Sequence, residues 1–208
     1  MIAAMLRRSL VAFGLWLLAN AAAGLGFDLV SAGLLGLDSW RFFIQGLFAG
    51  VLFGAAQWLV LRPFFVDVRW WVPATVVASP VSWMLGVTFA GLTFGFGGWL
   101  GGGASAAAQT LVLALGAGRD ETLMRVSFLW LPASLIGGAL FYFGYYSALV
   151  LAVGPPSHVA LREPTPFQDV LAGSIAYGVV TGLAVAILAA VANRRSARNA
   201  ASRPAAID

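Results

Sequence analysis

The sequence predicts an all-α, polytopic membrane protein of six transmembrane helices, arranged as three repeated hairpins that close into a ring with pseudo-threefold symmetry. Three observations support this fold class: the composition, the spacing of the apolar segments, and a pattern that occurs twice. Hydrophobic residues make up 61% of the 208 residues and charged residues 10%, and the mean hydropathy is +0.90. A soluble domain carries about 25% charged residues. This composition is typical of a chain that folds in a bilayer.

Six apolar segments have about the 20 residues that a helix needs to cross the hydrocarbon core. They cover residues 10–25 (or on to 35), 40–61, 71–94, 98–115, 126–153 and 170–192. No charged residue occurs between Arg69 and Arg119, and one helix over that interval would be about 70 Å long at 1.5 Å per residue. The chain must therefore reverse there, and we expect the reversal at Gly95-Phe96-Gly97-Gly98, where glycine gives the backbone the necessary freedom.

The positions of the arginines orient the bundle. With six spans, only Arg41 and Arg162 lie outside, and the other ten lie on the cytoplasmic side: Arg7, Arg8, Arg62, Arg69, Arg119, Arg125, Arg194, Arg195, Arg198 and Arg203. Because basic residues are enriched in cytoplasmic loops, we expect both termini on the cytoplasmic side of a bacterial inner membrane. Residues 1–193 then form the transmembrane domain and 194–208 a basic cytoplasmic tail. The tail favours anionic lipid, and not nucleic acid, as its partner.

The repeated unit is a helical hairpin. Its first helix ends in A-A-Q-x-L-V-L, with Gln57 in the second span and Gln109 in the fourth. Its second helix begins W-x-P-A-[ST], with Trp71 in the third span and Trp130 in the fifth. A fainter third copy joins the last span, at 178–185, to the first, at 16–20. The first span also imitates a cleaved signal peptide, but its removal would leave the ring incomplete, so we retain it.

Small residues recur at every fourth position of the first helix in each hairpin. They predict a stripe along which a neighbouring backbone approaches closely, as lipid-embedded helices require. The three stripes are Gly46, Gly50 and Gly54, then Gly98, Gly102 and Ala106, then Ser174, Gly178 and Gly182.

Polar side chains form one layer across the predicted bundle. Its members are Gln57, Gln109, Thr181, Asn20, Thr75 and Ser134. Two interpretations stay open. Each side chain could bond a neighbouring helix, at about 0.6 to 2 kcal/mol per bond. Alternatively, the six could line a path or hold a polar ligand head, although a pathway usually shows an ionisable residue as well.

Aromatic and ionisable residues carry further expectations. Trp16, Trp71 and Trp130, with Trp58 and Trp70, should lie near the cytoplasmic interface, where an indole keeps one edge in water. We expect the first helix to end near Gly26, which makes Asp28 a surface acid; if the helix continues, Asp28 is a buried carboxyl. An outer interfacial belt, or a seat for a lipid, a quinone, a pigment or another subunit, is predicted at Phe141, Tyr142, Phe143, Tyr145 and Tyr146.

No catalytic or metal-binding pattern is present in the sequence. There is no cysteine or lysine, and His158 is the single histidine, so thiolate, phosphate-loop and multi-histidine chemistry are excluded. We therefore expect a protein that is not an enzyme and has no metal site. The sequence predicts no cofactor, and residues that would bind one are unknown. Two functions fit: an accessory subunit packed against other membrane subunits, for example of an energy-transducing complex, or a small permease or channel for a neutral or amphiphilic solute.

The motif Q-W-L-V-L-R at 57–62, followed by W-W-V-P-A at 70–74, resembles a family of uncharacterised bacterial multipass membrane proteins built from tandem Gln-Trp-Leu-Val-Leu-Arg hairpins. The resemblance covers most of residues 46–192 and is most specific in the second and third spans. It departs from the pattern at Gln109-Thr110 and Leu115-Gly116, where the tryptophan and the arginine are absent. It implies a multipass helical fold and brings no functional residues with it.

Overall fold

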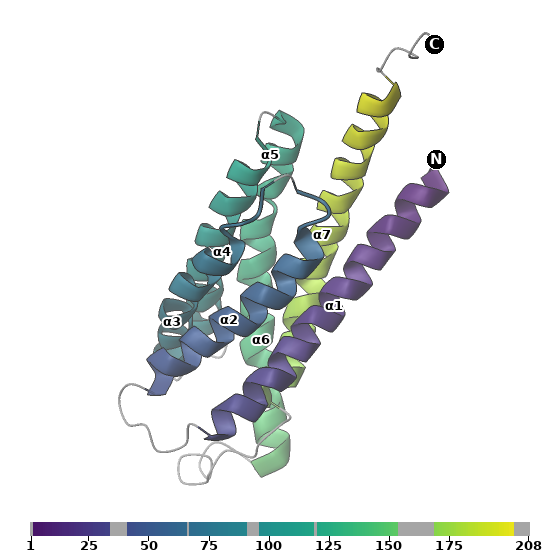
Figure 1. The fold of residues 1–208 in the computed structure, drawn as a ribbon. Helices are drawn as coiled ribbons and strands as arrows, with labels where there is room; N and C mark the ends of the chain where they lie inside the picture. Colours follow the sequence, from purple (N-terminus) through teal and green to yellow (C-terminus); the bar gives the residue numbers. More distant parts are fainter. Residues whose placement is uncertain are drawn as a thin grey trace.

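The computed structural model describes residues 2–33, 41–65, 67–90, 96–118, 120–153 and 169–201, and every regular element within them is an α-helix. In chain order the helices are α1 (Ile2–Gly33), α2 (Arg41–Leu61), α3 (Trp71–Ala90), α4 (Phe96–Gly116), α5 (Glu121–Ser127), α6 (Trp130–Val153) and α7 (Asp169–Ala201) (Figure 1). His158 lies outside the described residues.

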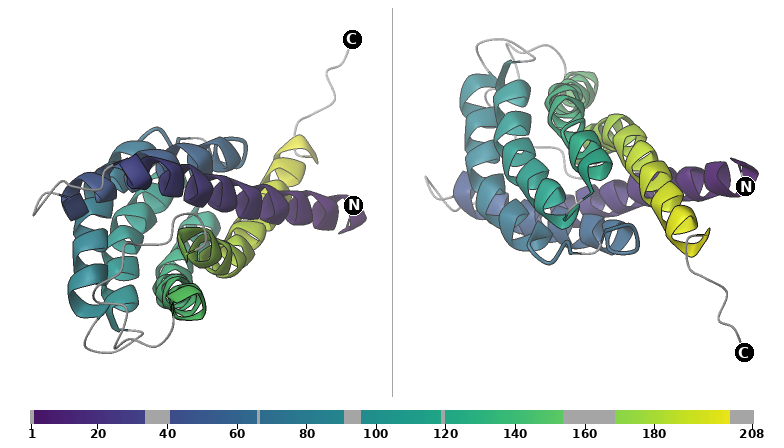
Figure 2. Two further views of the ribbon diagram at one scale, coloured as in Figure 1. Left: turned by 90° about the horizontal axis from the view of Figure 1, so that it is seen from below. Right: turned by 90° about the horizontal axis from the view of Figure 1, so that it is seen from above.

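The long helices form a closed ring. Each packs on the next in the order α1, α2, α3, α4, α6 and α7, and α7 packs back on α1. Figure 1 shows α1 and α7 side by side although they come from opposite ends of the sequence, and Figure 2 shows the ring from its two ends. The first turns of α1, the last turns of α7 and the short α5 lie at one end, called the α5 end below. The first and last helices are therefore neighbours, as the sequence predicts for them.

Membrane insertion follows from the length and composition of these helices. Within the described ranges, four segments are long and apolar enough to cross a bilayer: Leu6–Val30, Phe43–Leu61, Glu121–Phe141 and Val170–Arg194. Large apolar side chains are exposed on the outside of the ring, with Leu18, Val77 and Leu115 each more than 60% accessible. In water such a surface would cause aggregation, whereas in lipid it is the expected covering.

The first helix is longer than the apolar pattern indicates. It continues through Gly24 and Gly26 to Gly33, and Asp28 is only 6% exposed, so the surface assignment of Asp28 is wrong. Tertiary packing explains the difference. The buried ring of Phe27 lies 5.0 Å from that of Trp83, and a Cβ on Gly24 would collide with the side chain of Ser174 in α7. These contacts outweigh the low helix propensity of glycine.

Two other boundaries differ from the sequence prediction. Phe96 to Gly98 are helical and open α4, so the reversal expected there is wrong for these three residues, and Gly95 lies outside the described residues. The expected fifth span is divided, because α5 ends at Ser127 and α6 begins at Trp130. Asp120 accounts for the separate α5, since its carboxylate accepts a hydrogen bond from the backbone N–H of Leu123 at 2.9 Å and caps the helix.

Glycines decide how closely α2 and α3 approach. A Cβ on Gly46 would collide with the backbone of Pro80, and one on Gly50 would lie 2.7 Å from the Cα of Val76. At Gly54 the nearest atom would be the Cβ of Thr75, at 3.2 Å. The two helices therefore touch along the predicted stripe, backbone to backbone over its first two glycines.

The same device operates less tightly elsewhere in the ring. A Cβ on Gly102 of α4 would lie 2.6 Å from the carbonyl oxygen of Ser134 in α6. On α7, Gly178 and Gly182 face side chains of α1, with contacts of 3.2 Å to Leu17 and 3.0 Å to Phe13. The surroundings of the predicted packing residue Gly98 lie outside the part of the chain whose side chains are described.

Candidate functional site

Three tryptophans meet inside the ring. Trp16 of α1, Trp71 of α3 and Trp130 of α6 are each 0% exposed. Their ring centroids lie 5.2 Å (Trp16 to Trp130), 5.5 Å (Trp71 to Trp130) and 6.4 Å (Trp16 to Trp71) apart, all in edge-to-face geometry, which suits the quadrupoles of the indoles. The expectation that these three indoles keep one edge in water is wrong. Trp70, at 59% exposure, does fit it.

Buried indoles need acceptors for their N–H groups, because an unsatisfied donor in an apolar interior is costly. Trp16 Nε1 donates to Thr181 Oγ1 of α7 at 2.9 Å, and Trp130 Nε1 donates to Gln109 Oε1 of α4 at 3.0 Å. Thr181 and Gln109 therefore complete the tryptophan cluster, each from a neighbouring helix.

The amide nitrogens of the two glutamines bond other helices. Gln57 Nε2 donates to Asn20 Oδ1 of α1 at 2.9 Å, and Gln109 Nε2 donates to Thr75 Oγ1 of α3 at 3.1 Å. Asn20 and Thr75 in turn donate to the backbone carbonyl oxygens of Trp16 and Trp71, at 2.8 Å each. The polar side chains thus support the tryptophans through their own backbones as well.

The structure brings all six residues of the predicted polar layer together, and each is at most 3% exposed. Ser134 joins the layer through Tyr177 of α7, whose hydroxyl lies 3.4 Å from Ser134 Oγ. Among the described residues, side-chain hydrogen bonds therefore join every neighbouring pair of helices in the ring except α2 and α3. At that pair, Trp71 Nε1 and Gln57 Oε1 are buried and make no hydrogen bond within the described residues.

The two glutamines should differ in their contribution to stability. Gln109→Leu removes two hydrogen bonds and leaves the buried N–H of Trp130 without an acceptor, so we expect a loss of about 2 kcal/mol. Gln57→Leu removes one hydrogen bond together with an oxygen that has no partner, so we expect about 1 kcal/mol or less. Thermal unfolding of both variants in one detergent shows which substitution causes the larger loss of stability. Equal losses, or a larger loss for Gln57→Leu, would contradict the bonding described above.

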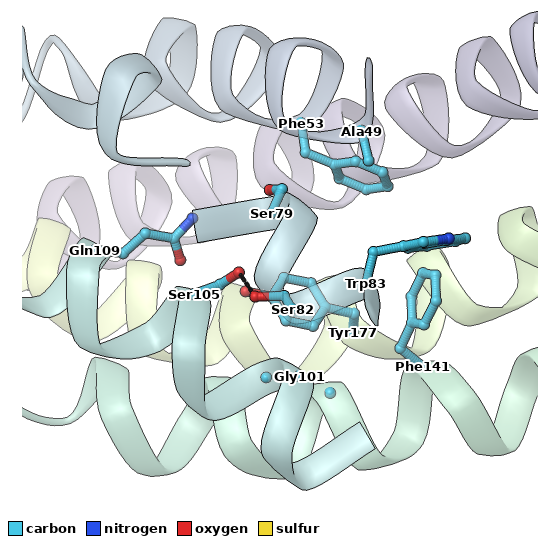
Figure 3. A pocket seen from close by; sticks show the side chains of 12 residues that line it. Ala49, Phe53, Ser79, Ser82, Trp83, Gly101, Ser105, Gln109, Phe141 and Tyr177 are labelled. Carbon is cyan, nitrogen blue, oxygen red and sulfur yellow. Dashed lines mark hydrogen bonds between the residues drawn. The ribbon is translucent and has the colours of Figure 1, made fainter. Parts of the chain in front are cut away.

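A cavity of about 120 Å³ adjoins the polar layer. Its lining comes from α2, α3, α4, α6 and α7. Gln109 belongs to both the layer and the lining, and Ser105 and Gly101 follow it one and two turns farther from the α5 end. In Figure 3 the hydroxyls of Ser82 and Ser105 meet beside Gln109, whereas Trp83 and Phe141 face each other at the opposite end. The cavity is therefore polar next to the tryptophan cluster and aromatic beyond it.

Phe141 was expected in the outer belt, but it lines this cavity, with its ring 6.3 Å from that of Trp83. Phe143, two residues on, is exposed as predicted. Sequence reasoning also missed Ser82, Ser105 and Tyr177. The available signal for one of them was spacing, because Ser105 stands one helical turn before Gln109 and on the same face.

Charged pairs lie in the short connections and in α5, away from the layer. Arg69 Nε lies 3.3 Å from Asp67 Oδ2, and Arg125 Nη2 lies 3.6 Å from Glu121 Oε2, with both pairs well exposed. Such pairs contribute little to stability. The guanidinium of Arg62 lies 5.5 Å from the ring centroid of Trp58, a pairing that suits a membrane interface.

No family model, no curated protein and no solved structure matches this chain. Within the described ranges, no group of three His, Asp or Glu residues is placed to hold a metal ion. The class that the fold defines is a helical membrane protein with a hydrogen-bonded tryptophan cluster and an adjoining cavity.

Proposed function

We propose that this chain is a non-enzymatic integral membrane protein and serves as an accessory or structural subunit of a larger membrane complex. Six spans are part of the proposal. Besides the four apolar segments given above, α3 has 20 residues and α4 has 21, which is the length a bilayer requires. Both helices occupy places in the same ring as the four.

The proposed topology has both termini on the cytoplasmic side of a bacterial inner membrane, so that the α5 end faces the cytoplasm. Its support is the grouping of Arg62, Arg69 and Arg125 in the connections and in α5. We also propose a threefold repeat and membership of the family with tandem Gln-Trp-Leu-Val-Leu-Arg hairpins. In favour of the repeat, Trp16, Trp71 and Trp130 each come from a different hairpin and meet at one point.

The observation that carries the accessory role is the closed interior. Three fully buried indoles occupy the centre of the ring, and the polar side chains around them bond neighbouring helices. A path for a solute would need polar groups that face water. Here those groups are used for helix packing, which favours a rigid module over a conduit.

The permease alternative is favoured by one observation, the cavity beside Gln109. For that cavity to belong to a transport path, the tryptophan cluster would have to open during each cycle. Transport would then depend on breaking the bonds from Trp16 to Thr181 and from Trp130 to Gln109.

Gentle detergent extraction of the tagged chain from its native membrane separates the two functions. We expect it to migrate on a native gel with other membrane proteins at constant stoichiometry, and reconstituted vesicles to show no solute flux. Gln57→Leu and Gln109→Leu should change thermal stability only. Migration as an isolated bundle, together with flux that both substitutions abolish, would overturn the accessory role and support the permease.

A further inference from the structure

The cavity has two chemically different ends, and none of the described side chains that line it is charged. Ser79, Ser82, Ser105 and the amide of Gln109 lie at the end beside the tryptophan cluster, and Phe53, Trp83 and Phe141 provide aromatic walls at the other (Figure 3). Without a charged partner the site disfavours ions. It suits a neutral molecule with an apolar body and a polar group at one end.

The hydrogen bonds at the polar end leave an acceptor available. The hydroxyl of Ser82 donates to the backbone carbonyl of Ala78 at 3.0 Å. Ser82 Oγ and Ser105 Oγ lie 2.5 Å apart, and either hydroxyl can donate. Because a serine oxygen has two lone pairs, Ser105 Oγ keeps at least one of them in either direction, and a ligand hydroxyl can donate to it.

The aromatic end also has unused polar capacity. Trp83 Nε1 is buried and has no hydrogen-bond partner within the described part of the chain. A buried N–H without an acceptor is costly, and such groups in native proteins usually meet a water or a ligand atom. This observation is independent of the serine pair, and the face of an aromatic ligand ring is one acceptor that such an N–H can take.

The volume indicates the size of the part of an occupant that the cavity can hold. An apolar cavity of about 150 Å³ holds one benzene ring, and this cavity, which is not fully enclosed, measures about 120 Å³. We propose that it binds a neutral single-ring compound that carries a hydroxyl, of which phenol is the simplest. The ring packs against the aromatic walls that Phe53, Trp83 and Phe141 provide, and the hydroxyl donates to Ser105. This site does not depend on the accessory role proposed above.

Phenol and anisole test the proposal, because they share a ring and only phenol can donate a hydrogen bond. The probes are added to the purified full chain in detergent, and binding to empty micelles is subtracted. We expect saturable binding of phenol that is about three- to tenfold tighter than that of anisole, the range for one hydrogen bond. Phenol uptake that equals micelle partition, or no preference over anisole, overturns the proposal.

Variants of Ser105 locate the binding. Ser105→Ala removes the acceptor, and phenol should then bind no better than anisole. Ser105→Leu fills the cavity and should abolish saturable binding of both probes. Ala107→Leu is the matched control, since it adds the same side chain to an exposed position of the same helix. It should change the binding of neither probe. If Ser105→Leu does not fold, Ser105→Ala still tests the proposal. A preference for phenol over anisole that is retained in Ser105→Ala overturns it.

A free phenol and a membrane-borne phenol would present the same ring to the site. In nanodiscs, 4-nonylphenol carries this ring on a tail that stays in the bilayer. Competition between it and phenol at a single site supports a lipid-borne ligand, and exclusion of nonylphenol while phenol binds supports a free solute. If both probes bind saturably and neither displaces the other, a single shared site is overturned.

Discussion

Trp16→Ala is expected to destabilise the protein by about 3 to 5 kcal/mol, which is the range for truncating a fully buried tryptophan. Trp16 is 0% exposed and packs edge to face against Trp71 and Trp130. The truncation removes these contacts and also the hydrogen bond that joins α1 to Thr181 of α7. Because that bond lies where the ring closes, α1 should separate before the other helices. Thermal unfolding in detergent, with proteolysis to detect release of α1, measures both effects.

Two comparisons isolate the cause. Trp16→Phe keeps an aromatic ring and loses the N–H donor with part of the buried ring volume, so we expect it to lose less than Trp16→Ala, about 1 to 2 kcal/mol. Trp99→Ala truncates a tryptophan of α4 that is 54% exposed, and it should change the stability by no more than about 0.5 kcal/mol. If Trp16→Ala were as stable as Trp99→Ala, the tryptophan cluster would not hold the ring together.

Gly46→Ala is expected to destabilise the protein by about 2 kcal/mol or more, although alanine is the better helix former. The new methyl group would collide with the Cα of Pro80 and lie 2.9 Å from its nitrogen. These are backbone atoms, so α2 and α3 must move apart to accommodate the methyl. No side-chain hydrogen bond joins α2 to α3 within the described residues, so close packing has to hold the pair. Unfolding measurements in a single detergent give the change in stability.

Gly14→Ala is the matched control. A Cβ on Gly14 of α1 would have no atom within 4 Å, so only helix propensity acts, and we expect a gain of up to about 1 kcal/mol. The two substitutions are chemically identical and should have opposite signs. A neutral or stabilising Gly46→Ala would show that the backbones of α2 and α3 are not in contact at this point.

Sequence patterns predicted much of the polar layer and little of the cavity. Gln57 and Gln109 stand in identical frames, and that repetition was enough to place both amides at one depth together with Thr75 and Asn20. Ser82, Trp83 and Tyr177 have no repeated counterpart, so nothing in the spacing distinguished them from ordinary packing residues. Phe141 belongs to an aromatic run of five neighbours, and a run cannot indicate which member faces inward.

The extent of α1 and the direction of the tryptophans were predicted wrongly for a common reason. Gly26 weakens a helix by propensity, and a tryptophan at a helix end favours an interface, but both rules describe a single helix in its solvent. In this protein, contacts with neighbouring helices decide both outcomes. Packing of Phe27 against Trp83 extends α1, and an acceptor on an adjacent helix lets Trp16 and Trp130 be buried completely.

The sequence by itself indicated that the chain folds in a bilayer, that it is helical, and that Gln57 and Gln109 occupy equivalent positions in their helices. Composition and spacing carry this information because they act within one helix at a time. Only the tertiary structure decided that three indoles meet at the centre and that space remains between Gln109 and Phe141. Each of these depends on side chains from helices far apart in the chain. Their mutual distances are set by packing and hydrogen bonding, which no local pattern contains.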